Sequence, residues 1–442
     1  MPLRGPLRRP ALALPPSALL SSSNNAITKT PLRISPLPRS AVAVRQRRGH
    51  ATHLPVPDTR PKTAIFFPGQ GVQRVGMLTP WLEAFPSTTS EIIDEIDSVV
   101  GYKLSDVIQN GPGKELNLSP NAQPAIMATS IMIIRILEKH FNFRVEDNAH
   151  FTLGHSLGEF AALVAGGYIH FQDSLRMVQK RAEAMSNATR QAEEMYGGEY
   201  GMVALVSSKA EHLPPLIAAI HEFVGYGSAG SKEESATDDD WSPIDQVLIA
   251  NVNSKTQIVL SGSIERIKTL VAHVRQFLGH DPRAVRLKSD SPFHSPIMKP
   301  AVGVLQQMMA GNSMVKGREN EDIVTFPGKV TCISNVTARP FESREQLKDL
   351  LARQAVETVQ WWDSIKYLDQ SMKVRRWVGI GPGYVGRNLV GKEVGMRGKD
   401  VVKGGGVWAI TDPKEIEEVL RGLEETDFYE DDEWQDAWDR WD

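Results

Sequence analysis

Cysteine is almost absent from this sequence of 442 residues, in which Cys332 is the only one. A single cysteine cannot form a disulfide within the chain, so the protein does not look built for an oxidising compartment. Cys332 lies in an apolar stretch, VTCIS, which favours a buried core thiol over a catalytic one. No apolar run approaches the roughly 20 residues that a membrane-spanning helix requires, so we expect no membrane span.

Acidic residues are missing from the first 57 residues, which contain nine Lys or Arg and no Asp or Glu. This Arg- and Ser-rich composition is typical of a mitochondrial transit peptide, so we expect residues 1–57 to direct the chain to the mitochondrial matrix. Several early prolines argue against one long amphipathic helix, so the match is compositional. The alternative is a disordered arm that binds nucleic acid, but we expect no nucleic-acid partner.

Acidic charge is concentrated in two segments, although the chain as a whole has a net charge of only -3. Residues 424–442 carry ten acids and one Arg, and residues 232–240 carry five acids and one Lys. The body of the chain outside these segments and the basic N-terminus is close to neutral. The acidic total therefore does not imply an acidic functional surface.

Short apolar runs bounded by Gly and Pro predict buried strands at 64–67, 151–153, 330–333 and 374–380. Helical patterns lie between them, which indicates an α/β protein. From 201 to 287 the predicted order becomes strand, helix, strand, strand, helix, strand, which is typical of a ferredoxin-like module.

We therefore predict four parts beyond the N-terminal segment. They are a large α/β domain formed by residues 58–190 and 289–423, an inserted ferredoxin-like subdomain at 191–288, a disordered loop at about 225–243 within it, and an acidic tail at 424–442.

The strongest chemical signal is the segment GHSLGE, in which Ser156 lies between Gly154 and Gly158. A serine between two glycines on a tight turn from a strand to a helix is a nucleophile elbow. The beginning of the following helix offers backbone N–H groups to a developing oxyanion. Since G-x-S-x-G also occurs by chance, the predicted strand before it and helix after it carry the interpretation.

A serine nucleophile needs a base, and His294 follows the last predicted strand of the inserted module. The alternative for His294 is a histidine in a solvent-facing loop. The Gly-rich segment 67–73 follows the first strand, where its backbone N–H groups could complete an oxyanion hole or form a simple turn.

Arg181 lies at the edge of the apolar stripe of a predicted helix. A partly buried guanidinium requires an anionic partner, which is either an internal carboxylate or a substrate carboxylate. The sequence GPGYVG at 381–386 fits a dinucleotide-binding pattern only weakly, because no clear βαβ unit with a ribose-binding acid follows it.

Taken together, the motifs resemble the malonyl-CoA:acyl carrier protein transacylases and the related acyltransferase domains of fatty acid and polyketide synthases. Besides Arg181, the matching segments are FPGQGVQ at 67–73, GHSLGE at 154–159, ANVNS at 250–254, FHS at 293–295, NVT at 335–337, VQW at 359–361 and GIGPG at 379–383.

The resemblance implies an α/β-hydrolase-like large domain with an inserted ferredoxin-like small domain. It implies Ser156 as nucleophile, His294 as its base and Arg181 as the group that binds the malonyl carboxylate. It also implies an oxyanion hole formed by the backbone N–H groups of Gln70 and Leu157.

In this family a backbone carbonyl rather than an Asp typically orients the histidine, and Gln360 matches that position. Phe293 is similar to the malonyl-selective pattern, and Asn251 is a possible pocket residue. The implied substrates are malonyl-CoA and acyl carrier protein in mitochondrial type II fatty acid synthesis, with no metal and no cofactor. The alternatives are a serine thioesterase or esterase of α/β-hydrolase type, and a non-catalytic binding protein.

Overall fold

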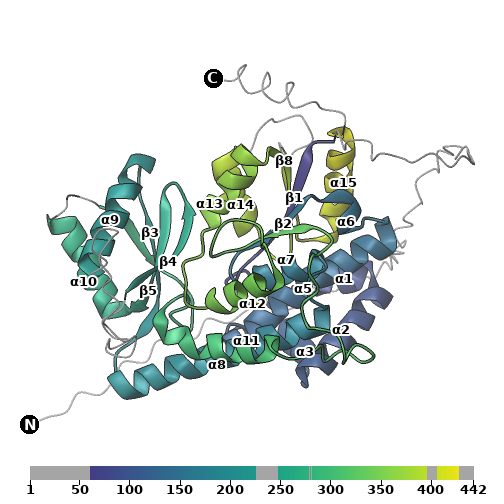
Figure 1. The fold of residues 1–442 in the computed structure, drawn as a ribbon, viewed down its shortest axis with the longest axis horizontal. Helices are drawn as coiled ribbons and strands as arrows, with labels where there is room; N and C mark the ends of the chain where they lie inside the picture. The colour runs from purple at the N-terminus through teal and green to yellow at the C-terminus, as the bar shows by residue number, and fades with distance from the viewer. Residues whose placement is uncertain (1–59, 225–246, 278, 280, 396–405, 428–442) are drawn as a thin grey trace, which may run out of the picture. The chain divides into compact units, whose positions relative to one another are not determined.

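The computed structural model describes residues 60–224, 247–277, 279, 281–395 and 406–427 (Figure 1). The predicted transit peptide, the predicted loop at 225–243 and most of the predicted acidic tail lie outside these residues.

A five-stranded parallel sheet forms the centre of the large α/β part, with strand order β7-β2-β1-β8-β9. The strands are β1 (Lys62–Phe67), β2 (Phe151–Gly154), β7 (Thr331–Ile333), β8 (Val374–Ile380) and β9 (Val407–Ile410). The first four occupy the four predicted strand positions, whereas β9 was not predicted. The α/β class is therefore confirmed.

Side chains of β1 alternate between two apolar clusters because successive residues of a strand point to opposite faces. Ile65 and Phe67 belong to the larger cluster, and Ala64 and Phe66 belong to a second one. Both faces of the sheet are thus covered, as a parallel sheet requires.

The helices before the small sheet are α1 (Thr79–Ala84), α2 (Pro86–Val100), α3 (Leu104–Asn110), α4 (Gly113–Leu116), α5 (Ser119–Phe141), α6 (Val145–Asn148), α7 (Gly158–Ala165) and α8 (Phe171–Tyr196). Helix α5 is apolar almost all round, and most of its side chains are buried in the larger cluster.

The later helices are α11 (Lys299–Met309), α12 (Arg344–Arg353), α13 (Trp361–Lys366), α14 (Val385–Val394) and α15 (Ile416–Glu425), and a π-helical turn (Tyr367–Ser371) follows α13. Apolar residues of α13 and α14 fill the second cluster.

A separate antiparallel sheet has strand order β4-β5-β3-β6. It contains β3 (Tyr200–Val206), β4 (Leu248–Ser254), β5 (Gln257–Ser263) and β6 (Arg283–Arg286). Helices α9 (Leu213–Val224) and α10 (Ile264–Phe277) share one apolar cluster with one face of this sheet (Figure 1). The other face packs against α8 and residues 293–301, which brings the small sheet to the large part.

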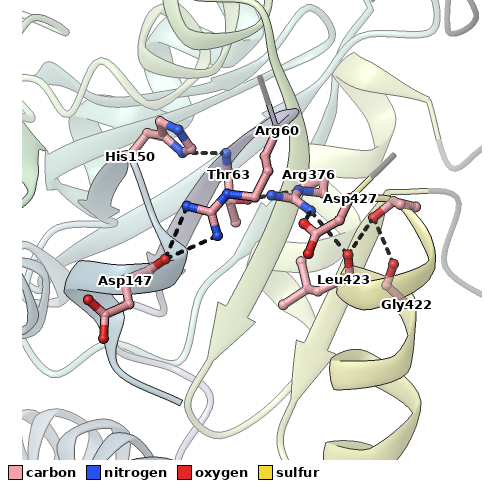
Figure 2. A network of polar contacts seen from close by, with 9 residues as sticks. Arg60, Thr63, Asp147, His150, Arg376, Gly422, Leu423 and Asp427 are labelled. Atoms are coloured by element: carbon pink, nitrogen blue, oxygen red, sulfur yellow. Dashed lines mark hydrogen bonds and ion pairs between the residues drawn. The ribbon is translucent and has the colours of Figure 1, made fainter. Parts of the chain in front are cut away.

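A buried arginine in β8 ties the sheet to the C-terminal helix (Figure 2). The Arg376 Nε donates to Thr63 Oγ1 of β1 at 2.9 Å, and its Nη1 donates to the Leu423 carbonyl of α15 at 3.1 Å. Asp427 completes the pairing as the counterion that a buried guanidinium needs. The network therefore fixes α15 against the end of the sheet at which β1 begins.

Candidate functional site

The turn from β2 into α7 carries Ser156 in a left-handed backbone conformation, with a φ angle of 53°. A Cβ atom added to Gly154 would lie 1.9 Å from the Gly158 carbonyl carbon, and one added to Gly158 would lie 2.6 Å from the Phe67 carbonyl oxygen. No side chain fits at either position, so the two glycines are sterically required. This confirms the predicted nucleophile elbow geometry.

Asn335, just after β7, holds the elbow through three hydrogen bonds. Its Oδ1 accepts from the Ser156 N–H at 2.7 Å, and its Nδ2 donates to the Gly154 carbonyl at 2.7 Å. Its own backbone N–H donates to Glu159 Oε1 at 2.9 Å. Sequence reasoning missed this contribution, although the motif NVT at 335–337 signalled that the position matters.

His294 meets Ser156 directly, with 2.7 Å between Ser156 Oγ and His294 Nε2. The His294 Nδ1 contacts the carbonyl oxygens of Gln354 at 2.7 Å and Glu357 at 3.1 Å. Since carbonyl oxygens only accept, Nδ1 carries the proton and Nε2 is free to accept the serine proton. Burial, followed by the charge of Arg181, lowers the pKa of His294 to about 3, so the imidazole is neutral near pH 7.

The prediction that Gln360 orients the histidine is wrong. The carbonyls of Gln354 and Glu357 do so, because both lie between α12 and α13 and neither accepts a backbone hydrogen bond from a described residue. Gln360 instead is the N-cap residue just before α13, and its carbonyl accepts from the backbone N–H and the hydroxyl of Ser364. Among the described residues, no carboxylate takes the place of the two carbonyls against His294.

Arg181 of α8 is only 1% exposed, and amide oxygens hold it. Its Nη1 donates to Gln123 Oε1 at 2.7 Å, and its Nη2 donates to Gln354 Oε1 at 3.2 Å. In the described part of the chain Arg181 forms no ion pair and its Nε has no hydrogen-bond partner. The alternative of pairing with an internal carboxylate is therefore not what the structure shows.

Glu159 is the buried acid whose charge bears on Arg181, and burial raises the pKa of this carboxyl to about 8. Burial thus favours the protonated form of Glu159. Burial also lowers the pKa of Arg181, to about 10, which leaves it charged. Arg181 therefore stays charged without an ion-pair partner among the described residues, which suits a carboxylate ligand.

A cavity of about 440 Å³ opens over Ser156 and His294. Asn251 and Phe293 line it as predicted, and Gln70 also lines it, whereas Leu157 and Arg181 are not among the lining residues. One wall of the cavity comes from the loops after β1 and β2. These loops lie at the carboxyl ends of parallel strands, where ligands commonly bind. A second wall includes Met202 and Val259 of the small sheet.

The backbone N–H groups of Gln70 and Leu157 make no hydrogen bond with any described residue. The Ser156 N–H is already bound by Asn335. The N–H groups of Gln70 and Leu157 are therefore free to donate, which agrees with the predicted oxyanion hole.

Three further observations concern the single cysteine, possible metal ligands and helix length. Cys332 is fully buried and burial raises the pKa of its thiol, which confirms an inert core residue. Across the described ranges, no group of three His, Cys, Asp or Glu side chains could hold a metal ion. No helix within those ranges is long and apolar enough to cross a membrane.

Comparison with known proteins agrees with this geometry. Residues 65–222 match the Acyl transferase domain family. Malonyl CoA-acyl carrier protein transacylase of Bacillus subtilis (strain 168) is 33% identical over 364 residues, which cover 82% of this chain and 98% of the relative.

Solved structures agree as well. The acyl-carrier-protein-S-malonyltransferase from Bartonella henselae superposes with a TM-score of 0.64 at 30% identity, over 82% of this chain and 99% of its own. A malonyl-transacylase in complex with its type II PKS acyl-carrier protein gives a TM-score of 0.62 at 26% identity, over 82% of this chain and 99% of its own. With such similarity along nearly the full length of these relatives, the chain belongs to the malonyl CoA-acyl carrier protein transacylase family.

Proposed function

We propose that this protein transfers malonyl from malonyl-CoA to the phosphopantetheine thiol of acyl carrier protein through an ester on Ser156. The observation that carries the proposal is the 2.7 Å contact between Ser156 Oγ and a neutral, buried His294, with the charged Arg181 held nearby without an ion pair. Membership of the transacylase family supports the same reaction.

The first half-reaction begins when His294 Nε2 takes the Ser156 hydroxyl proton and Oγ attacks the thioester carbonyl. The resulting oxyanion accepts hydrogen bonds from the Gln70 and Leu157 N–H groups. The C–S bond then breaks, and coenzyme A leaves as a thiol with the proton returned by His294.

The second half-reaction runs in reverse with a different thiol. The carrier's phosphopantetheine thiol gives its proton to His294 and attacks the malonyl ester, and Ser156 recovers its proton. Each step is an acyl or proton transfer between these groups, so the mechanism uses no metal and no redox cofactor.

The two backbone carbonyls on His294 favour this transferase over a serine esterase of α/β-hydrolase type, which normally uses an Asp or Glu there. The direct experiment is incubation with malonyl-CoA followed by mass spectrometry of the protein. A malonyl adduct that persists until acyl carrier protein is added supports the transferase. Rapid hydrolysis would indicate an esterase, and no adduct a binding protein.

The pH dependence of the reaction is expected to reflect the depressed pKa of His294. An ordinary histidine loses its activity as a base below about pH 6.5, but His294 remains neutral until the pH approaches its pKa of about 3. We therefore expect kcat/KM for malonyl-CoA to stay level from pH 8 to pH 5, with no acid limb near 6.5.

The same shift makes folding sensitive to acid. Because the pKa of His294 is lower in the folded state, the stability it supports is complete above pH 6.5 and is lost as the pH falls toward 3. In His294→Asn, the free energy of unfolding should depend less on pH between 6.5 and about 3.

For the activity profile, an acid limb of kcat/KM centred near pH 6.5 in the unaltered enzyme would contradict the assigned protonation state of His294.

The fold supports two finer interpretations. We interpret residues 191–288 as an inserted ferredoxin-like subdomain, because β3-α9-β4-β5-α10-β6 has the element order of that module. We interpret residues 58–190 and 289–423 as an α/β-hydrolase-like large domain, since a nucleophile elbow follows one of its parallel strands.

The location of the enzyme remains a proposal that rests on composition. An acid-free, Arg-rich segment of 57 residues supports import into mitochondria and a role in type II fatty acid synthesis there. Deletion of residues 1–57 should leave the malonyl transfer rate unchanged and retain the protein in the cytosol. Fractionation of cells that express the full and shortened chains measures this, and a shortened chain that still reaches mitochondria would disprove it.

A further inference from the structure

Asp290 lies four residues before His294, in the loop that follows β6. Its Oδ2 accepts from the Ser119 backbone N–H at 2.7 Å, and its Oδ1 accepts from the Ser119 hydroxyl at 2.5 Å. Ser119 is the fully buried first residue of α5. A carboxylate there satisfies donors that the helix leaves unpaired and interacts favourably with the helix dipole. The loop that leads to His294 is thus fixed to the start of α5.

The Ser119 hydroxyl also contacts Gln70. Because a carboxylate only accepts, the hydroxyl proton points to Asp290, and the oxygen accepts from Gln70 Nε2 at 3.0 Å. The oxygen of the same side-chain amide, Gln70 Oε1, accepts from Gln123 Nε2 at 3.1 Å. The Gln70 side chain is therefore anchored on both sides.

We propose that Asp290 is a positioning residue for the oxyanion hole, which it aligns through Ser119 and Gln70. Gln70 lies between Gly69, which packs closely against His155, and Gly71, which has a φ angle of 110°, so its neighbours have no side chains of their own to fix its orientation. The side-chain anchors of Gln70 then add to the restraint on the direction of its N–H. This inference rests on the proposed function, in which that N–H binds the oxyanion.

The same carboxylate links the loop of the base to the loop of the oxyanion donor. Asp290 is in the segment that carries His294, and Ser119 passes the restraint to Gln70. Proton transfer and oxyanion binding are thereby held in one fixed relation, which acyl transfer requires within fractions of an ångström.

Ser119→Ala tests the link most selectively, because it removes the hydroxyl and leaves Asp290 on the helix N-terminus. We expect kcat for malonyl transfer to fall at least about tenfold, with KM for malonyl-CoA unchanged. The ratio of malonyl to acetyl rates should also stay constant, because both thioesters place the same carbonyl in the hole. Asp290→Ala should show a larger loss of kcat, and Asp290→Asn should restore part of it.

A spectroscopic measurement separates positioning from stability. Hydrogen bonds to the ester carbonyl on Ser156 lower its stretching frequency, which infrared difference spectra of enzyme acylated with ¹³C-labelled malonyl-CoA can report. We expect the band to move to higher frequency in Ser119→Ala and Asp290→Ala. If both variants show the same band position and the same kcat as the unaltered enzyme, the proposed role of Asp290 is overturned.

Ser105→Ala is the matched control. Ser105 of α3 makes the same pair of contacts with Asp97, through its N–H at 3.0 Å and its hydroxyl at 2.6 Å, and neither residue lines the cavity. We expect this variant to keep the original kcat and band, and an equal loss of kcat in both serine variants would overturn the proposal. If the unaltered enzyme forms no malonyl ester, the proposed function falls and this role falls with it, whereas an ester with an unmoved band rejects the role of Asp290 alone.

Discussion

We expect Ser156→Ala to abolish formation of the malonyl-enzyme, because the variant lacks the oxygen that would carry the acyl group. The fold should survive, since alanine tolerates the positive φ of 53° about as well as serine does and only one atom is lost. The side chain of Asn335 accepts from the backbone N–H of residue 156 and makes no hydrogen bond with its hydroxyl, so the elbow should also keep its shape.

Mass spectrometry after incubation with malonyl-CoA measures the adduct, and thermal unfolding checks the fold. His294→Ala provides a comparison in which the nucleophile remains but its base is gone, so the ester should form slowly rather than not at all. A covalent malonyl group on the Ser156→Ala protein would place the nucleophile elsewhere.

Arg181→Ala should reverse or flatten the preference for malonyl-CoA over acetyl-CoA. In a desolvated pocket, loss of an Arg–carboxylate pair costs on the order of 2–5 kcal/mol, part of it from stranding the remaining charge. That corresponds to roughly 30-fold to several-thousand-fold in kcat/KM for malonyl-CoA. Acetyl-CoA has no carboxylate, so its kcat/KM should hold or rise.

The partners of Arg181 sharpen this expectation. The guanidinium already donates to Gln123 and Gln354, so a malonyl carboxylate would use its remaining donors, including the unpartnered Nε. Arg181→Lys should recover only part of the preference, because an ammonium cannot bind a carboxylate with two parallel hydrogen bonds. Equal losses of kcat/KM on both thioesters would show instead that Arg181 serves only to position Gln354.

Removal of Arg181 should also change the titration of His294. The positive charge of Arg181 contributes to the depressed pKa of His294, so the pKa should rise in Arg181→Ala. The two substrates should therefore be compared at about pH 8, where the imidazole is neutral in either protein.

Prediction from the sequence succeeded where local patterns determine structure. The strand before Ser156, the helix after it and the need for glycine at 154 and 158 all follow from residues close together in the chain. The strand and helix order of the small sheet was equally readable, because each element has its own apolar periodicity.

Contacts between distant residues could not be read in the same way. The prediction of Gln360 failed because which carbonyl is free depends on where α12 ends and α13 begins, and no pattern in that stretch marks the boundary. The Asn335 clamp and the Asp290–Ser119 contact depend on which loops the parallel sheet brings together. Arg181 could be placed on a helix, but its amide partners come from two other segments.

The long sequence separations within the site bear on how activity arises during synthesis. Ser156 depends on His294, 138 residues later, and on Asn335, 179 residues later. A nascent or broken chain that ends before Asn335 contains the complete elbow sequence but neither the clamp nor the carbonyls that orient the base. Partial chains should therefore be unable to capture malonyl-CoA, and reactivity should appear only in a polypeptide that extends at least through Glu357.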